Sequence, residues 1–345
     1  MDTYNYKEPV DLACIGKRDP LFVDLVLTKA FSRLQGVCFL GGIDYTFVPN
    51  PNGRQHHARY NRFQHSLGVA KLALVYADKK ELNECDRRLV YSAALLHDIG
   101  HSPLSHSLEP VFEQVLGYNH HAASKKVILG QVEIGVQVHQ VLRSYSVDPG
   151  RVAGLISGEE DGFDSFFSGP INFDSIEGVM RTRQYIKNAV TATSPITLLL
   201  AAMRRETSRD EDIVDSFWCT KKNVYQLAVQ SYKGLASDSI CQSIAMSFAD
   251  RLSDSDYFLT DRGLFSKIPE VKDAIVSFAK MGQYAGFLCS DKEYKSRNFF
   301  IDSSGDFFRR QDSQRYRQEK IKRKISHIKQ DRPVTEPEHG VLFDE

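Results

Sequence analysis

The sequence predicts an all-α fold, a helical bundle with minor β-hairpin elements and an α-helical C-terminal extension. The first observation is that most segments repeat apolar residues every three or four positions, as in Leu21–Leu34. The second is that apolar–polar alternation is rare, with Tyr45–Val48 and Phe299–Asp302 the best strand candidates. The third is that no internal repeat is present.

The same periodicity predicts helices along most of the chain. After Leu21–Leu34 we expect a helix at Ser66–Ala77, then one with Asp86 as N-cap that stops at Gly100, before Pro103. The remaining expected helices are Ser105–Leu116, His121–Leu129, Val136–Tyr145, Pro149–Ile156, Asp174–Asn188, Thr197–Arg205, Glu211–Ser231, Asp238–Leu252 and Pro269–Met281.

Chain length limits the number of domains, and net charge limits the classes of partner. Its 345 residues suggest one large domain or two. We expect an N-terminal segment (1–20), a main domain (21–255), a C-terminal lobe packed on it (256–308) and a tail (309–345). Because 44 basic residues balance 44 acidic ones, bulk charge does not favour a nucleic-acid or membrane partner.

Cysteine and hydropathy patterns predict a cytoplasmic protein with no membrane partner. The six cysteines are scattered without a CxxC pair, which favours reduced thiols, mostly in the core, over disulfides or a zinc site. The N-terminus lacks the apolar core of a signal peptide. The longest apolar run, Pro195–Met203, is far shorter than the about 20 residues that a membrane span needs.

The stretch Arg309–Arg332 is strongly basic, with ten lysines and arginines against three acids. Two interpretations remain open. It is a solvated, partly helical tail, or one docked on an acidic surface of its own chain, or it is a patch that binds phosphate or nucleic acid.

Histidine placement is the feature that indicates chemistry, since most of the eleven histidines lie between His56 and His121. His97 and Asp98 are adjacent at the end of an apolar helix, and burying Asp98 costs several kcal/mol unless it is paired or metal-bound. Imidazole nitrogen with carboxylate oxygen suits Mn, Fe, Co, Ni or Zn. Such a metal activates water and polarises a phosphoryl group, while nearby histidines serve as general acid. Ordinary helix histidines are the alternative, which this density disfavours.

Two segments, RFQHSLGVA and LLHDIGHSPLSHSLEPVF, resemble the H…HD…D signature of HD-domain metal-dependent phosphohydrolases. The resemblance is closer to the deoxynucleoside triphosphate triphosphohydrolase (dNTPase) branch. AFSRLQGVCFLGG, SFWCTKKNVYQLAVQS and YFLTDRGLF extend it over roughly residues 21–300. It implies that residues 21–255 form an HD phosphohydrolase domain, with nucleotide substrates and a homo-oligomer. It also implies one divalent metal ion (Mn, Fe, Co, Ni, Zn or Mg), with a second Mg²⁺ possible alongside substrate.

The resemblance also assigns the metal and catalytic residues. The metal ligands would be His65, His97, Asp98 and Asp174, where Asp174 begins a later helix and is alternatively a simple N-cap. The catalytic group would be His106 and His120 as candidate proton donors, Glu109 as the carboxylate that orients them, and His101 near phosphate or a second metal.

For substrate binding, the resemblance points to Arg62, Phe39, Leu40, Lys221 and Gln230. Several pocket positions depart from the family pattern. Phe39 replaces a Gln that meets the sugar, Ser175 a triphosphate-binding Lys, and Gly178 a Tyr that packs on deoxyribose; Thr182, Val229 and His121 differ as well. We therefore expect a retained metal site, an altered sugar and triphosphate pocket, and room at Gly178 for a bulkier substrate such as a strand end.

Three functions remain open from the sequence. A (d)NTP triphosphohydrolase-like enzyme leads. An HD nuclease that hydrolyses single-stranded DNA or RNA is the second, favoured by Arg309–Arg332. A catalytically silent, nucleotide-binding regulatory module is the third, suggested by the altered pocket.

Overall fold

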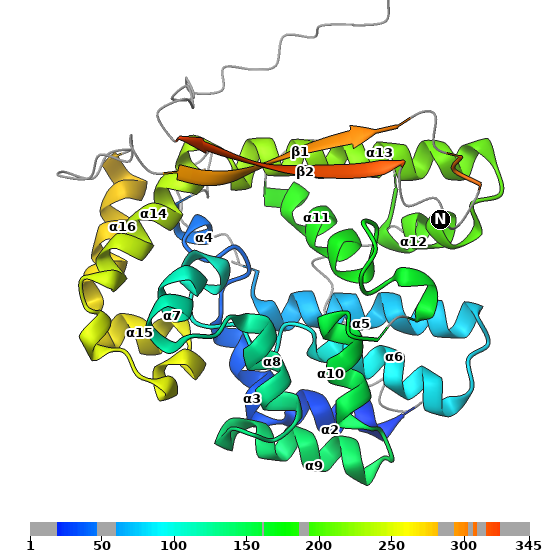
Figure 1. Cartoon of the computed structure of the whole chain (residues 1–345), viewed down its shortest axis with the longest axis horizontal. Coiled ribbons are helices and arrows are strands. Elements are labelled where there is room, and N and C mark those ends of the chain that lie inside the picture. The colour runs from blue at the N-terminus through cyan, green and yellow to red at the C-terminus, as the bar shows by residue number, and fades with distance from the viewer. Residues whose placement is uncertain are drawn as a thin grey trace, which may run out of the picture.

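A computed structural model describes residues 19–46, 60–160, 162–185, 193–281, 293–302, 306–308 and 315–324. Within these ranges the chain is helical except for one two-stranded antiparallel sheet (Figure 1). The prediction of an all-α fold with a minor β-hairpin is confirmed. None of the helices in the described ranges is long and apolar enough to cross a membrane.

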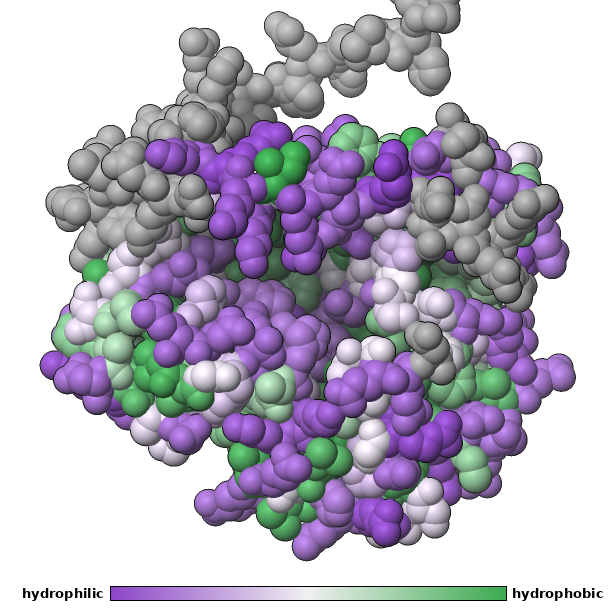
Figure 2. Space-filling model, viewed as in Figure 1, coloured by the Kyte–Doolittle hydropathy of each residue, from purple (hydrophilic) through white to green (hydrophobic). Residues whose placement is uncertain are grey.

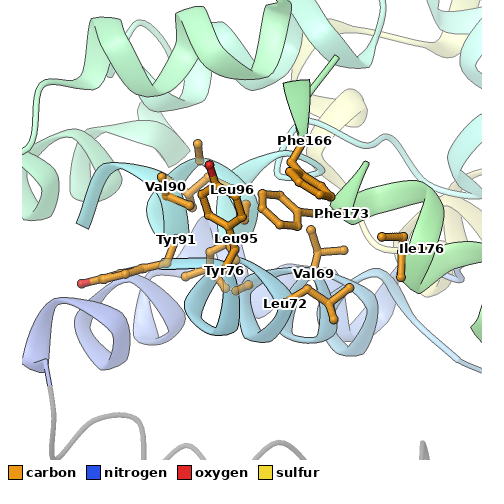
Figure 3. Close-up of a cluster of buried hydrophobic side chains, with 14 of the residues drawn as sticks. Val69, Leu72, Tyr76, Val90, Tyr91, Leu95, Leu96, Phe166, Phe173 and Ile176 are labelled. Carbon is orange, nitrogen blue, oxygen red and sulfur yellow. The ribbon is translucent and has the colours of Figure 1, made fainter. Parts of the chain in front are cut away.

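Helices α5 (Arg62–Lys79) and α6 (Glu84–Leu96) pack against each other at the centre of the main core. Aromatic and aliphatic side chains from this pair meet those of the chain leading into α11 (Phe173–Tyr185) (Figure 3). The residues labelled there are Val69, Leu72, Tyr76, Val90, Tyr91, Leu95, Leu96, Phe166, Phe173 and Ile176.

Other helices surround the pair. On one side α10 packs on α6 and α8, and α9 packs on α2; on the other, α11 and α12 pack on α5 (Figure 1). A second cluster joins α14, α16 and α4. The bounds are α2 Pro20–Leu27, α3 Lys29–Ser32, α4 Ile43–Thr46, α7 Glu109–Leu116, α8 His120–Ile128, α9 Val136–Ser144, α10 Pro149–Ser157, α12 Pro195–Arg204, α13 Ser208–Val224, α14 Tyr232–Met246, α15 Asp261–Lys267 and α16 Pro269–Met281.

Several helix boundaries differ from the sequence prediction, as for α14 (Tyr232–Met246 against the expected Asp238–Leu252), and two of the differences arise because side chains cap the backbone. The predicted helix Leu21–Leu34 breaks at Thr28, whose extended ψ of 147° ends α2 and whose hydroxyl accepts a hydrogen bond from Phe31 N to start α3. The N-cap of α6 is Asn83 rather than Asp86. The Asn83 side chain accepts the Asp86 backbone N–H at 3.0 Å.

The sheet pairs β1 (Glu293–Ile301) with β2 (Tyr316–Lys324), and Arg297 lies opposite Lys320. The predicted strand Phe299–Asp302 is confirmed for Phe299–Ile301, where β1 ends. The expectation of a partly helical tail is wrong for residues 316–324, which form β2. Tyr316 is buried there and packs, with Phe299, on Trp218 of α13.

The other strand candidate is wrong for Tyr45 and Thr46, which belong to the short helix α4. The reason is local, since the Tyr45 N–H donates back to Gly42 O in a helical turn. Phe47 and Val48 lie outside the described residues. The expectation of core thiols holds for Cys38 and Cys241, while Cys85 and Cys219 are exposed.

One buried carboxylate joins three segments beneath the site. Asp261, the first residue of α15, accepts hydrogen bonds from Cys38 N at 3.0 Å, Leu104 N at 2.8 Å and the Tyr45 hydroxyl at 3.2 Å. Leu104 has a left-handed φ of 55°, a conformation that needs outside support. Asp261 therefore holds two loops that flank the site.

We predict that Asp261→Ala lowers the free energy of unfolding by about 3 kcal/mol, because it leaves buried backbone donors without partners. Urea denaturation measures this. Asp250→Ala, at an exposed carboxylate, is the matched control and should change stability by about 0.5 kcal/mol or less. A loss below about 1 kcal/mol for Asp261→Ala would show that the loops are held by other contacts.

Candidate metal centre and active site

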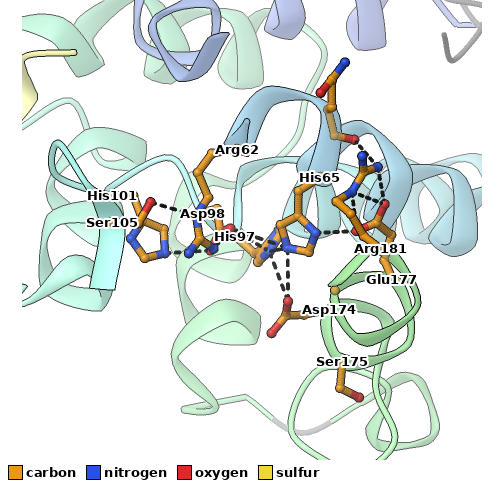
Figure 4. A network of polar contacts seen from close by, with 12 residues as sticks. Arg62, His65, His97, Asp98, His101, Ser105, Asp174, Ser175, Glu177 and Arg181 are labelled. Carbon is orange, nitrogen blue, oxygen red and sulfur yellow. Dashed lines mark hydrogen bonds and ion pairs between the residues drawn. The ribbon is translucent and has the colours of Figure 1, made fainter. Parts of the chain in front are cut away.

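Four side chains from three segments converge at one point between α5, α6 and α11 (Figure 4). His65 Nε2 lies 3.2 Å from His97 Nε2, 3.5 Å from Asp98 Oδ2 and 3.1 Å from Asp174 Oδ1. His97 Nε2 is 3.4 Å from Asp98 Oδ2 and 3.8 Å from Asp174 Oδ1. Ligand atoms that share one ion at about 2.0–2.2 Å stand about 2.8–3.6 Å apart, so the spacing suits a single metal ion.

Hydrogen bonding on the far side of both rings supports the same conclusion. His97 Nδ1 lies 2.8 Å from Ala94 O, which can only accept, so Nδ1 carries the proton. His65 Nδ1 is held at 2.5 Å by a carboxylate oxygen of Glu177. Two Nε2 atoms thus face each other 3.2 Å apart beside two carboxylates. A divalent cation bound there could be coordinated by all four side chains. A mixed set of nitrogen and oxygen ligands suits the transition metals expected from the sequence.

The sequence analysis did not identify Glu177 and Arg181. Glu177 is fully buried, bonds Arg181 as well as His65, and lies three residues after Asp174, so both face α5. Arg181 and His65 outweigh burial and lower the pKa of Glu177. Burial alone would lower the pKa of His65, but the carboxylates of Glu177, Asp174 and Asp98 raise it to about 9. The three-residue spacing of the two acids was the signal available in the sequence.

Asp174 is not the N-cap of α11. That role belongs to Asn172, whose side chain accepts the Ser175 N–H at 2.7 Å. The Asp174 side chain is 60% exposed, whereas those of His65, His97 and Asp98 are 0%, 13% and 7% exposed. Asp174 is therefore the ligand candidate on the solvent side of the centre.

Asp98 is also the hub of a buried charge network. Arg62 Nη1 donates to Asp98 Oδ2 at 2.6 Å, and Arg62 Nε donates to Ser105. His101 Nε2 lies 3.1 Å from the other Asp98 oxygen. Arg62 outweighs burial and holds the pKa of Asp98 well below its usual range. The Arg62 charge is thus engaged with a ligand carboxylate.

A second histidine group lies beside the first. Glu109 accepts from Nδ1 of His106, at 2.9 Å, and from Nδ1 of His120. These two hydrogen bonds outweigh burial and lower the pKa of Glu109. The His101 ring stacks on His120 with centroids 4.3 Å apart. The geometry thus places Glu109 between His106 and His120, where an orienting carboxylate was expected.

This group could also hold a metal ion, because ligand atoms of His101, His106 and His120 lie within 4.8 Å of one another. Three imidazoles suit a transition metal better than Mg²⁺, which prefers oxygen ligands.

Both groups border a cavity of about 840 Å³. Figure 2 shows the hollow in this face, between the hydrophilic side chains along the hairpin and the helices below it. The expected substrate residues Phe39, Leu40, Arg62, Lys221 and Gln230 all line it.

Two of these residues already have partners. Lys221 Nζ donates to Pro170 O at 3.0 Å, and burial lowers the pKa of Lys221 to about 8. Gln230 accepts from Ser296 and donates to Arg297 O, so it also holds β1.

The geometry agrees with sequence comparison. Residues 62–147 match the family model of the HD domain. The chain contains an HD domain. The Bacillus subtilis protein YwfO, which is uncharacterised, is 35% identical over 188 residues, or 52% of this chain and 40% of the relative. The chicken deoxynucleoside triphosphate triphosphohydrolase SAMHD1 is 32% identical over 170 residues, 46% of this chain and 25% of the relative.

Human SAMHD1 is 40% identical over 100 residues, which cover 27% of this chain and 15% of that protein. The aligned parts thus span well under half of these relatives. They place the HD domain near the dNTPase branch, as the sequence motifs predicted.

The structure shows which contacts are made at three positions that depart from the family pattern, Phe39, Ser175 and Gly178. A Cβ built on Gly178 would lie 3.5 Å from Phe39 Cζ and from His65 Cε1. The Phe39 ring therefore fills part of the space expected to be open at Gly178, and it is held between His65 and Arg62 with 4.7 Å between ring centroids and 5.0 Å to the guanidinium carbon. Ser175 takes part in the cap of α11, since its hydroxyl accepts from Asn172 N.

We predict that His97→Ala abolishes stoichiometric metal binding and that Glu177→Gln weakens it 10- to 100-fold, because Glu177 orients a ligand through Nδ1. Elemental analysis and calorimetric titration with Mn²⁺ measure both effects. Glu159→Gln, at an exposed carboxylate, is the control and should bind metal normally. Stoichiometric metal in the His97→Ala protein would contradict the assigned centre.

Proposed function

We propose that the chain is a metal-dependent phosphohydrolase that acts on nucleotides, similar to (d)NTP triphosphohydrolases but with an altered sugar and triphosphate pocket. One observation carries the proposal. The donor atoms of His65, His97, Asp98 and Asp174 converge in the wall of a cavity that also exposes a carboxylate-bound histidine pair. The likeness to proteins named as triphosphohydrolases supports the nucleotide class.

The two groups of residues have different roles, one in metal binding and the other in proton transfer. A divalent metal, when bound, lowers the pKa of water and polarises a phosphoryl oxygen. His65, His97, Asp98 and Asp174 would hold it. Glu109 accepts hydrogen bonds from Nδ1 of His106 and His120 and so favours the doubly protonated, cationic form of either ring, whose Nε2–H could then be given to a leaving oxygen. His120 is the more sheltered donor, with 12% of its side chain exposed against 59% for His106.

The cavity fits a nucleotide in size and charge. Its volume lies within the about 300–1,000 Å³ of sites for small molecules. Because Arg62 is engaged with Asp98, Lys221 is the expected substrate residue better placed to meet phosphate. Phe39 offers a ring instead of a polar partner near the sugar, so discrimination between ribose and deoxyribose should stay below about 10²-fold.

We predict that His120→Ala and His106→Ala retain the metal and lower kcat, by about 10²–10⁴-fold for the residue that is the general acid. The measurement is metal-dependent product release from matched ribo- and deoxynucleotides. His139→Ala, on α9 and away from the cavity, is the control. Wild-type rates for both variants would place the acid elsewhere. Nucleotide binding without metal-dependent turnover would instead indicate the regulatory module.

A further inference from the structure

The β1–β2 hairpin presents a row of cations that the proposed function leaves unused. Arg297 lies opposite Lys320, and Lys295 lies opposite Lys322. Alternate residues of a strand share a face, so these four side chains form one cation row. Three of them, Lys295, Arg297 and Lys320, line the cavity that contains the metal centre.

The charges of the cation row lack the compensation usual in a sheet. Like charges directly opposite each other destabilise a strand pair. Among the described residues, the hairpin's ion pairs are made by Arg315 and Arg317. Within that same part of the chain, no ion pair joins a carboxylate to Lys295, Lys320 or Lys322. A polyanion lying along the row would supply the missing negative charge.

The cation row extends beyond the cavity. Lys322 follows Lys320 by two residues, about 6.8 Å along a strand, and is exposed without lining the cavity. The phosphates of a nucleotide inside the cavity would meet Arg297 and Lys320 but would leave Lys322 unused. A ligand that serves the whole row must carry phosphates both inside and outside the cavity.

We propose that the cation row binds the backbone of a single-stranded nucleic acid and guides the strand toward the metal centre. The inference extends the proposed function from nucleotides to strands and rests on that function for the site at which the strand ends.

Fluorescence anisotropy with 12-nucleotide dT and rU oligomers tests the proposal, in EDTA so that no hydrolysis intervenes. Lys322→Ala and Lys295→Ala should each weaken binding about 3- to 10-fold and lower the slope of log affinity against log salt by about 0.7. The control is Arg323→Ala, which removes an exposed charge from the opposite face of the same strand and should change affinity less than 2-fold. Lys322→Ala should leave kcat/KM for nucleotides unchanged.

Three outcomes would overturn the proposal. One is no strand binding by the wild-type chain at 50 µM protein and about 50 mM salt. Another is an equal effect of Arg323→Ala and Lys322→Ala. The third is direct binding of inorganic tripolyphosphate that depends on Lys295 while no strand binds, which would assign the hairpin cations to a triphosphate inside the cavity. Failure of the proposed function is distinct, since it appears as absent metal-dependent hydrolysis while strands still bind in EDTA.

Discussion

The site depends on the close packing of α5 against α11. Gly68 allows it, because a Cβ at this position would lie 2.3 Å from a carboxylate oxygen of Glu177. The close approach lets Glu177 of α11 reach His65 Nδ1, while His65 Nε2 faces His97, Asp98 and Asp174. This packing therefore brings Asp174 to the other candidate ligands.

Alternating charge makes this buried arrangement tolerable. Arg181, Glu177, His65, Asp98 and Arg62 follow one another in contact, so each buried charge has an opposite neighbour. Of the four candidate ligands, Asp174 has the most exposed side chain. The buried network therefore lies behind the candidate ligands, and the cavity lies on the side of Asp174.

The sequence predicted what depends on local pattern. Apolar periodicity found most helices, and the HD dipeptide with its histidines led to the four ligand candidates. Glu177 was missed because its partner, His65, is 112 residues away, and the three-residue spacing from Asp174 does not by itself identify that partner. The β2 strand was missed because a run of lysines and arginines is typical of a solvated segment. Pairing with β1, the packing of Tyr316 on Trp218 and the hydrogen bond from the Tyr316 hydroxyl to Asp215 hold it in place. Single capping hydrogen bonds of Thr28 and Asn83 set two helix ends at positions other than those predicted, because apolar periodicity carries no information on such bonds.

The central claim is that one metal ion is held by His65, His97, Asp98 and Asp174. Anomalous diffraction from crystals loaded with Mn²⁺, recorded on both sides of the Mn absorption edge, tests it most directly. We expect one strong anomalous peak between His65 Nε2 and His97 Nε2, within bonding distance of the carboxylates of Asp98 and Asp174. A peak among His101, His106 and His120, with none at the first group, would contradict the account.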